Sequence, residues 1–242
     1  MNRQRLIIFS ILTLTFVGVS LLYFSRVWTD SHTRFRTGLP VPANILPKEL
    51  KDPDTIIPSG PPTLPTLRPT DPVLFGAASG SVTVVTFGDF QCPSCRDQAQ
   101  AVEDAMQLLG PDQRSVRVVW RDMPLVNQHP RAMAAAVAAQ CASKQGRFRQ
   151  MHDALFFQGT DLSDSEILTF ASNIGLKSQD FLVCERDPAI TFQLQKDLTD
   201  ATQHAISQVP TVFINGKPYE GYRDAQTLAN IIQGQLEFMK NP

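Results

Sequence analysis

A pair of cysteines between a buried strand and a helix constrains the fold of this chain more than any other feature. Residues 81–87 (SVTVVTF) are rich in β-branched side chains and are bounded by glycine, which predicts a buried strand. Residues 92–95 (CPSC) follow, and Pro93 suits the first turn of a helix because its missing N–H is not needed there. Residues 96–109 then carry apolar side chains at a helical period. The pattern predicts two cysteines at the start of a helix that follows a strand.

Cysteines in this position favour redox chemistry. The unpaired backbone N–H groups and the dipole of a helix N-terminus stabilise a thiolate, so Cys92 is predicted to have a lowered pKa and to act as the nucleophile. Cys95, one turn further, is placed to attack a mixed disulfide and release the product. Half of a zinc site is the alternative, but Cys141 and Cys184 are single cysteines without the pairing of zinc ligands. We therefore predict a redox pair and no bound metal.

The remaining elements predict an α/β domain. Residues 116–120 (VRVVW) have the composition of a second strand, and residues from about 129 to 206 have helical character throughout. After Pro210, the segment TVFI predicts a strand, and Asn215-Gly216 predicts a hairpin. The order is strand, helix with the cysteine pair, strand, helical block, hairpin and final helix.

Three segments carry a resemblance to a known family. Residues 87–95 (FGDFQCPSC), 138–156 (AAQCASKQGRFRQMHDALF) and 209–221 (VPTVFINGKPYEG) resemble the DsbA family of thioredoxin-fold disulfide oxidoreductases. The resemblance implies a thioredoxin fold with a helical insertion between the second strand and the cis-proline strand. It also implies that Pro210 is the cis-proline facing the cysteines, and that Val209 presents backbone groups to a bound polypeptide.

The chain departs from the family's pattern beside the cysteines. The dipeptide between them is Pro93-Ser94, without the histidine of the most oxidising members, and serine brings no positive charge, which predicts a lower reduction potential. Thr86 stands six positions before the first cysteine, where thioredoxins keep a buried aspartate. Asp89 and Asp97 are near the motif, and we expect them to be capping or solvated residues with no catalytic part.

Cys141 and Cys184 fall on different helices of the helical block. A bond between them would close a loop of 43 residues and be worth about 4 kcal/mol in the chain-entropy treatment. The alternative is two buried free thiols, which pack as small apolar groups. An oxidising compartment favours the bond, so we expect a structural disulfide.

The N-terminus predicts a membrane anchor. Arg3 and Arg5 precede residues 6–24, an uncharged run of 19 residues that is long enough to cross a bilayer as a helix. Signal-peptide cores are shorter, about 7–15 residues. We therefore predict that residues 1–28 form an anchor, with a signal peptide cleaved after Ser20 as the alternative.

A proline-rich segment follows the predicted anchor. Ten of the 18 prolines lie between Pro40 and Pro72, and proline removes backbone donors and favours extended conformations. Residues 29–72 are therefore predicted to form a semi-rigid spacer. Residues 73–242 form the predicted DsbA-like domain, with the helical insertion at about 129–206.

Charge and compartment complete the functional prediction. A net charge of −1 argues against a dedicated nucleic-acid binder. Because structural disulfides belong to oxidising compartments, we expect a single-pass protein of the cell membrane whose domain lies on the extracytoplasmic side. It would be monomeric, would need no cofactor, and would introduce disulfides into reduced or unfolded exported polypeptides.

The resemblance also implies a membrane partner, DsbB-like or equivalent, that reoxidises the cysteine pair. A disulfide isomerase or reductase of the same fold is the alternative within this chemistry. A peptide-binding or metal-handling module without turnover is the alternative from another class of protein.

Overall fold

The computed structural model describes residues 65, 67–77, 79–159 and 161–240. The predicted anchor and almost all of the predicted spacer lie outside these residues. Within them, no helix is both long enough and apolar enough to cross a membrane.

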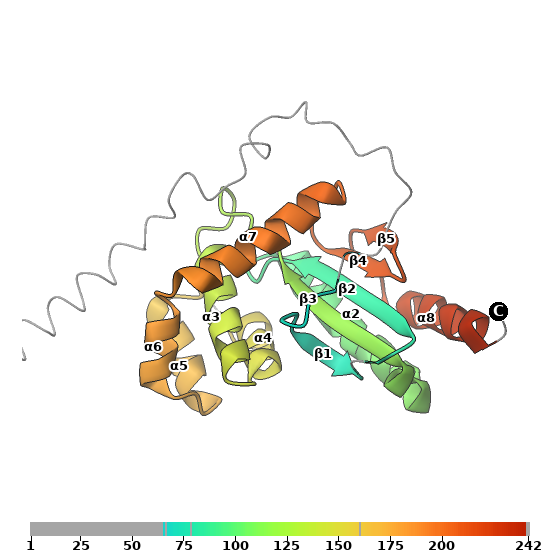
Figure 1. Ribbon diagram of the computed structural model, residues 1–242, viewed down its shortest axis with the longest axis horizontal. Coiled ribbons are helices and arrows are strands. Elements are labelled where there is room, and N and C mark those ends of the chain that lie inside the picture. The colour runs from blue at the N-terminus through green and yellow to red at the C-terminus, as the bar shows by residue number, and fades with distance from the viewer. Residues whose placement is uncertain (1–64, 66, 78, 160, 241–242) are drawn as a thin grey trace, which may run out of the picture. The chain divides into compact units, whose positions relative to one another are not determined.

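A five-stranded mixed sheet forms the centre of the described domain (Figure 1). Its strands are β1 (Val73–Gly76), β2 (Val82–Gly88), β3 (Val116–Asp122), β4 (Thr211–Ile214) and β5 (Lys217–Glu220), in the order β1-β3-β2-β4-β5. Strands β2 and β3 are parallel, and the other neighbours are antiparallel. Every residue of β2 is buried, as its β-branched composition predicts.

The helices divide into those that cover the sheet and those of the insertion. They are α2 (Pro93–Leu108), α3 (Ala132–Lys144), α4 (Phe148–Phe157), α5 (Asp164–Asn173), α6 (Ser178–Cys184), α7 (Pro188–Gln203) and α8 (Ala225–Lys240), with a short 3₁₀ helix, η2 (Gly110–Ser115), after α2. Helices α3 to α7 all lie between β3 and β4 in the sequence. The α/β class and the helical insertion are therefore confirmed.

The two faces of the sheet are covered by different helices. Val84 and Val118 belong to a large core shared with α2, α8 and the insertion helices, whereas Val85 and Phe87 face a smaller core with α7. This alternation follows from the strand period of two, which sends successive side chains to opposite faces. Figure 1 shows α3 to α6 grouped beside the sheet and α8 at its opposite end.

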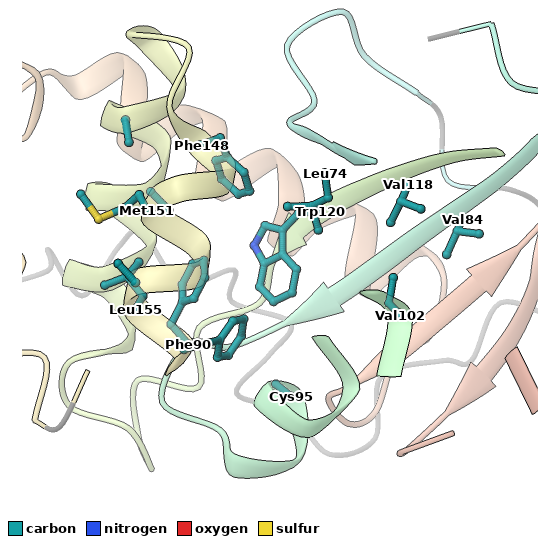
Figure 2. Packing of buried hydrophobic residues seen from close by; sticks show 14 of the residues in the cluster. Leu74, Val84, Phe90, Cys95, Val102, Val118, Trp120, Phe148, Met151 and Leu155 are labelled. Atoms are coloured by element: carbon teal, nitrogen blue, oxygen red, sulfur yellow. The ribbon is translucent and has the colours of Figure 1, made fainter. Parts of the chain in front are cut away.

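Aromatic side chains join the insertion to the sheet. The ring of Trp120, on β3, lies 5.1 Å from that of Phe90 and 5.6 Å from that of Phe156, on α4. Met151 and Leu155 of α4 are buried in the same core (Figure 2). These contacts fix the insertion against the end of the sheet that carries the cysteines.

Residues 68–72, which the sequence assigns to the spacer, contact the domain, and they lead into edge strand β1, for which the sequence shows no strand pattern. Arg68 pairs with Asp71 and Asp197, and Arg121, which is completely buried, pairs with Asp71 through Nη2 and Oδ2 at 2.7 Å. The backbone N–H of Trp120 donates to the carbonyl of Pro72. A proline pattern reports local conformation and carries no information on such long-range pairing.

Arg68, Asp71, Arg121, Asp122 and Asp197 form a buried charged cluster, and two of its carboxyl groups have raised pKa values. Burial, followed by the nearby charge of Asp197, raises the pKa of Asp122 to about 7. Burial raises the pKa of Asp197 to about 6, although Arg68 and Arg121 oppose the shift. Asp122 nevertheless accepts hydrogen bonds from Trp120 Nε1 at 2.7 Å and Gln140 Nε2 at 2.6 Å. The cluster therefore ties β3 to α3 and, through Asp197, to α7.

Candidate active site

Cys92 is the N-cap of α2, with its backbone still extended and Pro93 opening the helix. Its Sγ accepts a hydrogen bond from the backbone N–H of Cys95 at 3.3 Å and lies 3.1 Å from the hydroxyl oxygen of Ser94. Both cysteines are free, and their exposed fractions are 6% for Cys92 and 1% for Cys95. The first sulfur therefore sits among donors at the helix start, and the second is buried behind it.

The two thiols have opposite electrostatic environments. The pKa of Cys92 is lowered to about 6, chiefly because the Cys95 thiol donates to its sulfur, with further donation from Ser94 and the Cys95 backbone outweighing the cost of burial. Burial raises the pKa of Cys95. At neutral pH the pair can therefore hold one thiolate, on Cys92, and one thiol.

The sheet register brings the proline loop to the same end of the domain. Phe87 pairs with Thr211, so Val209 and Pro210 precede β4 at the end where β2 leads into the cysteine motif. The Val209–Pro210 peptide bond is cis, and the Pro210 carbonyl accepts from the N–H of Gly221 at 2.8 Å. Val209 packs against the core that contains both cysteines.

Asp89 caps the local turn, as expected, but it is buried rather than solvated and also makes a long-range contact. Its side chain is buried, Oδ1 accepts from the N–H of Gln91, and Oδ2 accepts from the N–H of Leu125, each at 2.7 Å. Nδ1 of His129 lies 2.9 Å from Oδ2. Asp89 thus fastens the turn before Cys92 to the segment after β3, a long-range role that local sequence does not encode. Asp97, by contrast, has a solvated side chain.

Gln98, one turn after Cys95 on α2, is a buried polar residue that the sequence pattern did not single out. It is completely buried, its Oε1 accepts from the N–H of Arg223 at 2.8 Å, and its Nε2 donates to the Arg223 carbonyl at 3.2 Å. These bonds hold the segment after β5 against α2. The sequence does contain a signal for this role, because an uncharged polar residue on the apolar face of an amphipathic helix indicates a buried side chain with hydrogen-bond partners.

The other two cysteines lie away from this site, in the insertion. Cys141 of α3 and Cys184 of α6 form a disulfide, with an S–S distance of 2.13 Å and a Cα–Cα distance of 5.7 Å. Because their sulfurs are bonded to each other, they do not complete a four-cysteine zinc site with Cys92 and Cys95. The described residues contain no other group of side chains suited to hold a metal ion.

Comparison with known proteins agrees with this geometry. Residues 68–234 match the sequence profile of the thioredoxin family. The chain is similar to a thioredoxin-like oxidoreductase from Silicibacter pomeroyi, with 26% identity and a TM-score of 0.61 over 72% of this chain and 95% of that one. It is also similar to the thiol-disulfide exchange protein alpha-DsbA2 from Wolbachia pipientis, with 22% identity and a TM-score of 0.59 over 68% and 87%. The chain therefore belongs to the thioredoxin family, and its fold is the one seen in the DsbA-like protein.

Curated sequence relatives include much longer proteins. The Na⁺/H⁺ antiporter NhaA 1 of Salinispora arenicola is 33% identical over 154 residues, which are 64% of this chain and 23% of the antiporter. The chain thus spans about a quarter of the length of that relative. Similarity to this part of the antiporter is no evidence that the present chain transports ions.

Proposed function

We propose that this protein is an extracytoplasmic dithiol oxidase that introduces disulfides into exported polypeptides. The observation that carries the proposal is the position of Cys92 at the start of α2, where its sulfur accepts from the Cys95 N–H at 3.3 Å and lies 3.1 Å from the Ser94 hydroxyl, an arrangement that lowers the pKa of Cys92 to about 6. A stabilised thiolate favours the reduced pair over its disulfide, and a disulfide that is easily reduced is a strong oxidant of other thiols. The pair Cys92–Cys95 is therefore suited to donate its disulfide.

The reaction proceeds by two exchanges. A substrate thiolate attacks Sγ of Cys92 in the Cys92–Cys95 disulfide, the S–S bond breaks, and Cys95 leaves as a thiolate that takes up a proton. A second substrate thiolate then attacks the substrate sulfur of the mixed disulfide and releases the Cys92 thiolate. The substrate has lost two electrons and the cysteine pair has gained them, so a separate disulfide or quinone-linked oxidant must restore the pair.

The loop before β4 provides the substrate contact in this proposal. Val209 and Pro210 lie at the sheet end that carries the cysteines, and an extended polypeptide can bind the backbone of Val209 as an added strand. Glu220 accepts from Ser207 and Gln208, which fixes the start of this loop. Backbone recognition suits unfolded chains of varied sequence.

The compartment and partners are part of the same proposal. The disulfide between Cys141 and Cys184 supports an oxidising compartment. Residues 6–24 would anchor the chain in the cell membrane, with the domain outside and a DsbB-like or equivalent membrane protein as the reoxidising partner. The domain would act as a monomer.

An exchange assay on the full chain in detergent tests this function. The oxidised protein should oxidise a reduced dithiol peptide stoichiometrically, and Cys92→Ser should be inactive. Reduced Cys95→Ser, mixed with the same peptide in its disulfide form, should accumulate a mixed disulfide on Cys92, because the Cys92 thiolate displaces one peptide sulfur and no second cysteine resolves the product. Rapid reduction of insulin disulfides together with slow peptide oxidation would instead favour the reductase or isomerase alternative. The Pro93-Ser94 dipeptide keeps that alternative open, because it adds no positive charge beside the thiolate.

A further inference from the structure

A cavity lies between the residues that lead into β1 and the helices of the insertion. Its volume is about 470 Å³, which is within the range of small-molecule sites, about 300–1,000 Å³. Its walls come from residues 69–73, the end of α3, the start of α4 and the start of α7. Neither Cys92 nor Pro210 lines it, so the cavity is separate from the exchange site.

The start of α4 provides this cavity with free backbone donors. The N-cap residue, Arg147, makes no capping bond through its side chain. The N–H groups of Phe148, Arg149 and Gln150 have no acceptor among the residues that the structure describes, and all three residues line the cavity. Free N–H groups in the first turn, together with the helix dipole, favour a bound anion.

The acceptors beside these donors are already occupied. At the end of α3, the carbonyls of Ala142 and Ser143 accept from N–H groups of the turn that follows. The carboxylate of Asp71, which also lines the cavity, is bound by Arg68 and Arg121. The polarity that remains unsatisfied at the cavity is therefore that of the donors.

The free charge at the cavity is also positive. Lys144 lines it, is exposed, and has no ion-pair partner within the described part of the chain. The guanidinium of Arg149 already pairs with Glu103 at 2.8 Å, so its charge is largely neutralised. A solvated lysine is ordinary by itself, but here it stands beside the uncapped helix start.

Gln140 adds a buried acceptor to the same cavity. The residue lines the cavity, is 4% exposed, and donates from Nε2 to Oδ2 of Asp122 at 2.6 Å. This bond fixes the orientation of the amide, and Oε1 has no donor among the described residues. Because buried polar atoms are normally paired, a ligand in the cavity should offer a donor to this oxygen.

We propose that the cavity binds a small organic anion that also carries a hydroxyl group. Its anionic group, a carboxylate or a phosphate, accepts from the N–H groups of Arg149 and Gln150 and pairs with Lys144. Its hydroxyl donates to Oε1 of Gln140. Phe148 and Ile190, which line the same cavity, contact its carbon skeleton.

A chain of hydrogen bonds gives this site a spectroscopic signal. Asp122 accepts from Gln140 through Oδ2 and from the indole N–H of Trp120 through Oδ1, at 2.7 Å for the second bond. A ligand that binds Gln140 should therefore change the fluorescence of Trp120. The other tryptophan, Trp28, is replaced by phenylalanine for this measurement, so that the signal comes from Trp120 alone.

Calorimetric titration of the full chain in detergent tests the site with two matched pairs of probes. Malate is compared with succinate, which lacks the hydroxyl, and glycerol 3-phosphate is compared with methyl phosphate. We expect malate or glycerol 3-phosphate to bind at one site per chain, more tightly than its counterpart and with a change in Trp120 fluorescence. Binding of malate identifies a carboxylate ligand, and binding of glycerol 3-phosphate identifies a phosphate ligand.

Charge variants locate the bound anion. Lys144→Glu and Gln150→Glu should each weaken binding by about tenfold or more, whereas Lys144→Arg should bind like wild type. A carboxylate at position 150 also favours the empty helix start, so thermal unfolding should show that Gln150→Glu is folded. Lys217→Gln, at an exposed lysine of β5 that does not line the cavity, is the control and should bind normally.

Three results would overturn the proposal. The first is the absence of saturable binding by both malate and glycerol 3-phosphate. The second is equal affinity for each probe and its counterpart without the additional hydroxyl. The third is an affinity that Lys144→Glu and Gln150→Glu leave unchanged, or that Lys217→Gln lowers as much as they do.

Discussion

At the scale of single residues, the reactivity of Cys92 depends on the donors around one sulfur atom. The Cys95 thiol, the Ser94 hydroxyl and the Cys95 backbone N–H all stabilise the thiolate, and burial works against them. None of these donors carries a charge. The lowered pKa therefore follows from the geometry of the helix start rather than from a neighbouring cation.

Removing one donor should move the titration of Cys92. Ser94→Ala deletes the hydroxyl 3.1 Å from the sulfur, and a hydrogen bond to a charged group is worth about 1.5–3 kcal/mol. We expect the pKa of Cys92 to rise by about one unit, from about 6. The pH dependence of alkylation of the reduced protein measures this shift. Asp97→Asn, at a solvated side chain, is the control, and equal midpoints in the two variants would contradict the assignment.

At the scale of elements, one cross-link joins two helices of the insertion, and another joins the N-terminal segment and α7 to the sheet. A disulfide joins α3 to α6. A buried charged cluster joins β3 and α7 to the residues just before β1 through Arg121, Asp197 and Asp71. Each of these links contributes to stability without touching the reactive sulfurs.

Loss of the disulfide should lower stability and spare chemistry. The double change Cys141→Ala and Cys184→Ala opens a loop of 43 residues, which should cost about 4 kcal/mol in the free energy of unfolding. Urea unfolding measures this cost, and peptide oxidation should stay near wild type. The control is wild type unfolded in strong reductant, which should approach the variant. Stability equal to that of oxidised wild type would show that the bond does not stabilise the domain.

Breaking the charged cluster should be costly in a pH-dependent way. Arg121→Met removes the buried cation that pairs with Asp71 and Asp200, so that Arg68 is left to face Asp71 and Asp197, and it should cost about 3–5 kcal/mol at neutral pH. The pKa of Asp197 is already raised to about 6, and loss of Arg121 raises it further. A carboxyl group whose pKa is raised in the folded state destabilises the protein as the pH rises and the group ionises. The stability deficit of Arg121→Met should therefore shrink when the pH falls to about 5.

Urea unfolding at the two pH values checks the expected behaviour of Arg121→Met. Arg96→Met, at an exposed pair with Asp97, is the matched control and should change stability by less than about 1 kcal/mol. A pH-independent deficit for Arg121→Met would assign the loss to packing of the side chain and contradict the electrostatic explanation.

At the scale of the whole molecule, the sequence predicted what depends on local pattern. The β-branched run of β2, the period of α2 and the turn at Asn215-Gly216 carry their signals within a few residues. The features that the sequence did not predict depend on contacts between residues that are far apart in the chain. Edge strand β1 and Arg68 acquire their roles from β3 and α7, and Asp89 acquires its role from the segment after β3. No window of sequence contains those partners.

The true start of the fold can be tested by truncation. A chain that begins at residue 67 retains Arg68 and Asp71, whereas one that begins at residue 73 loses both and leaves Arg121 short of a partner. We expect the shorter chain to be less stable by several kcal/mol, on the order of a broken buried ion pair. Thermal unfolding compares the two, and equal stability would place the start of the fold at residue 73.

The reduction potential of the Cys92–Cys95 pair tests the central claim most directly. It can be measured by equilibrating the full chain with glutathione buffers at neutral pH. The thiolate of Cys92, with a pKa of about 6, stabilises the reduced pair, so we expect a potential between about −200 and −120 mV. A potential near that of thioredoxin, about −270 mV, would contradict the oxidase and identify the protein as a reductase.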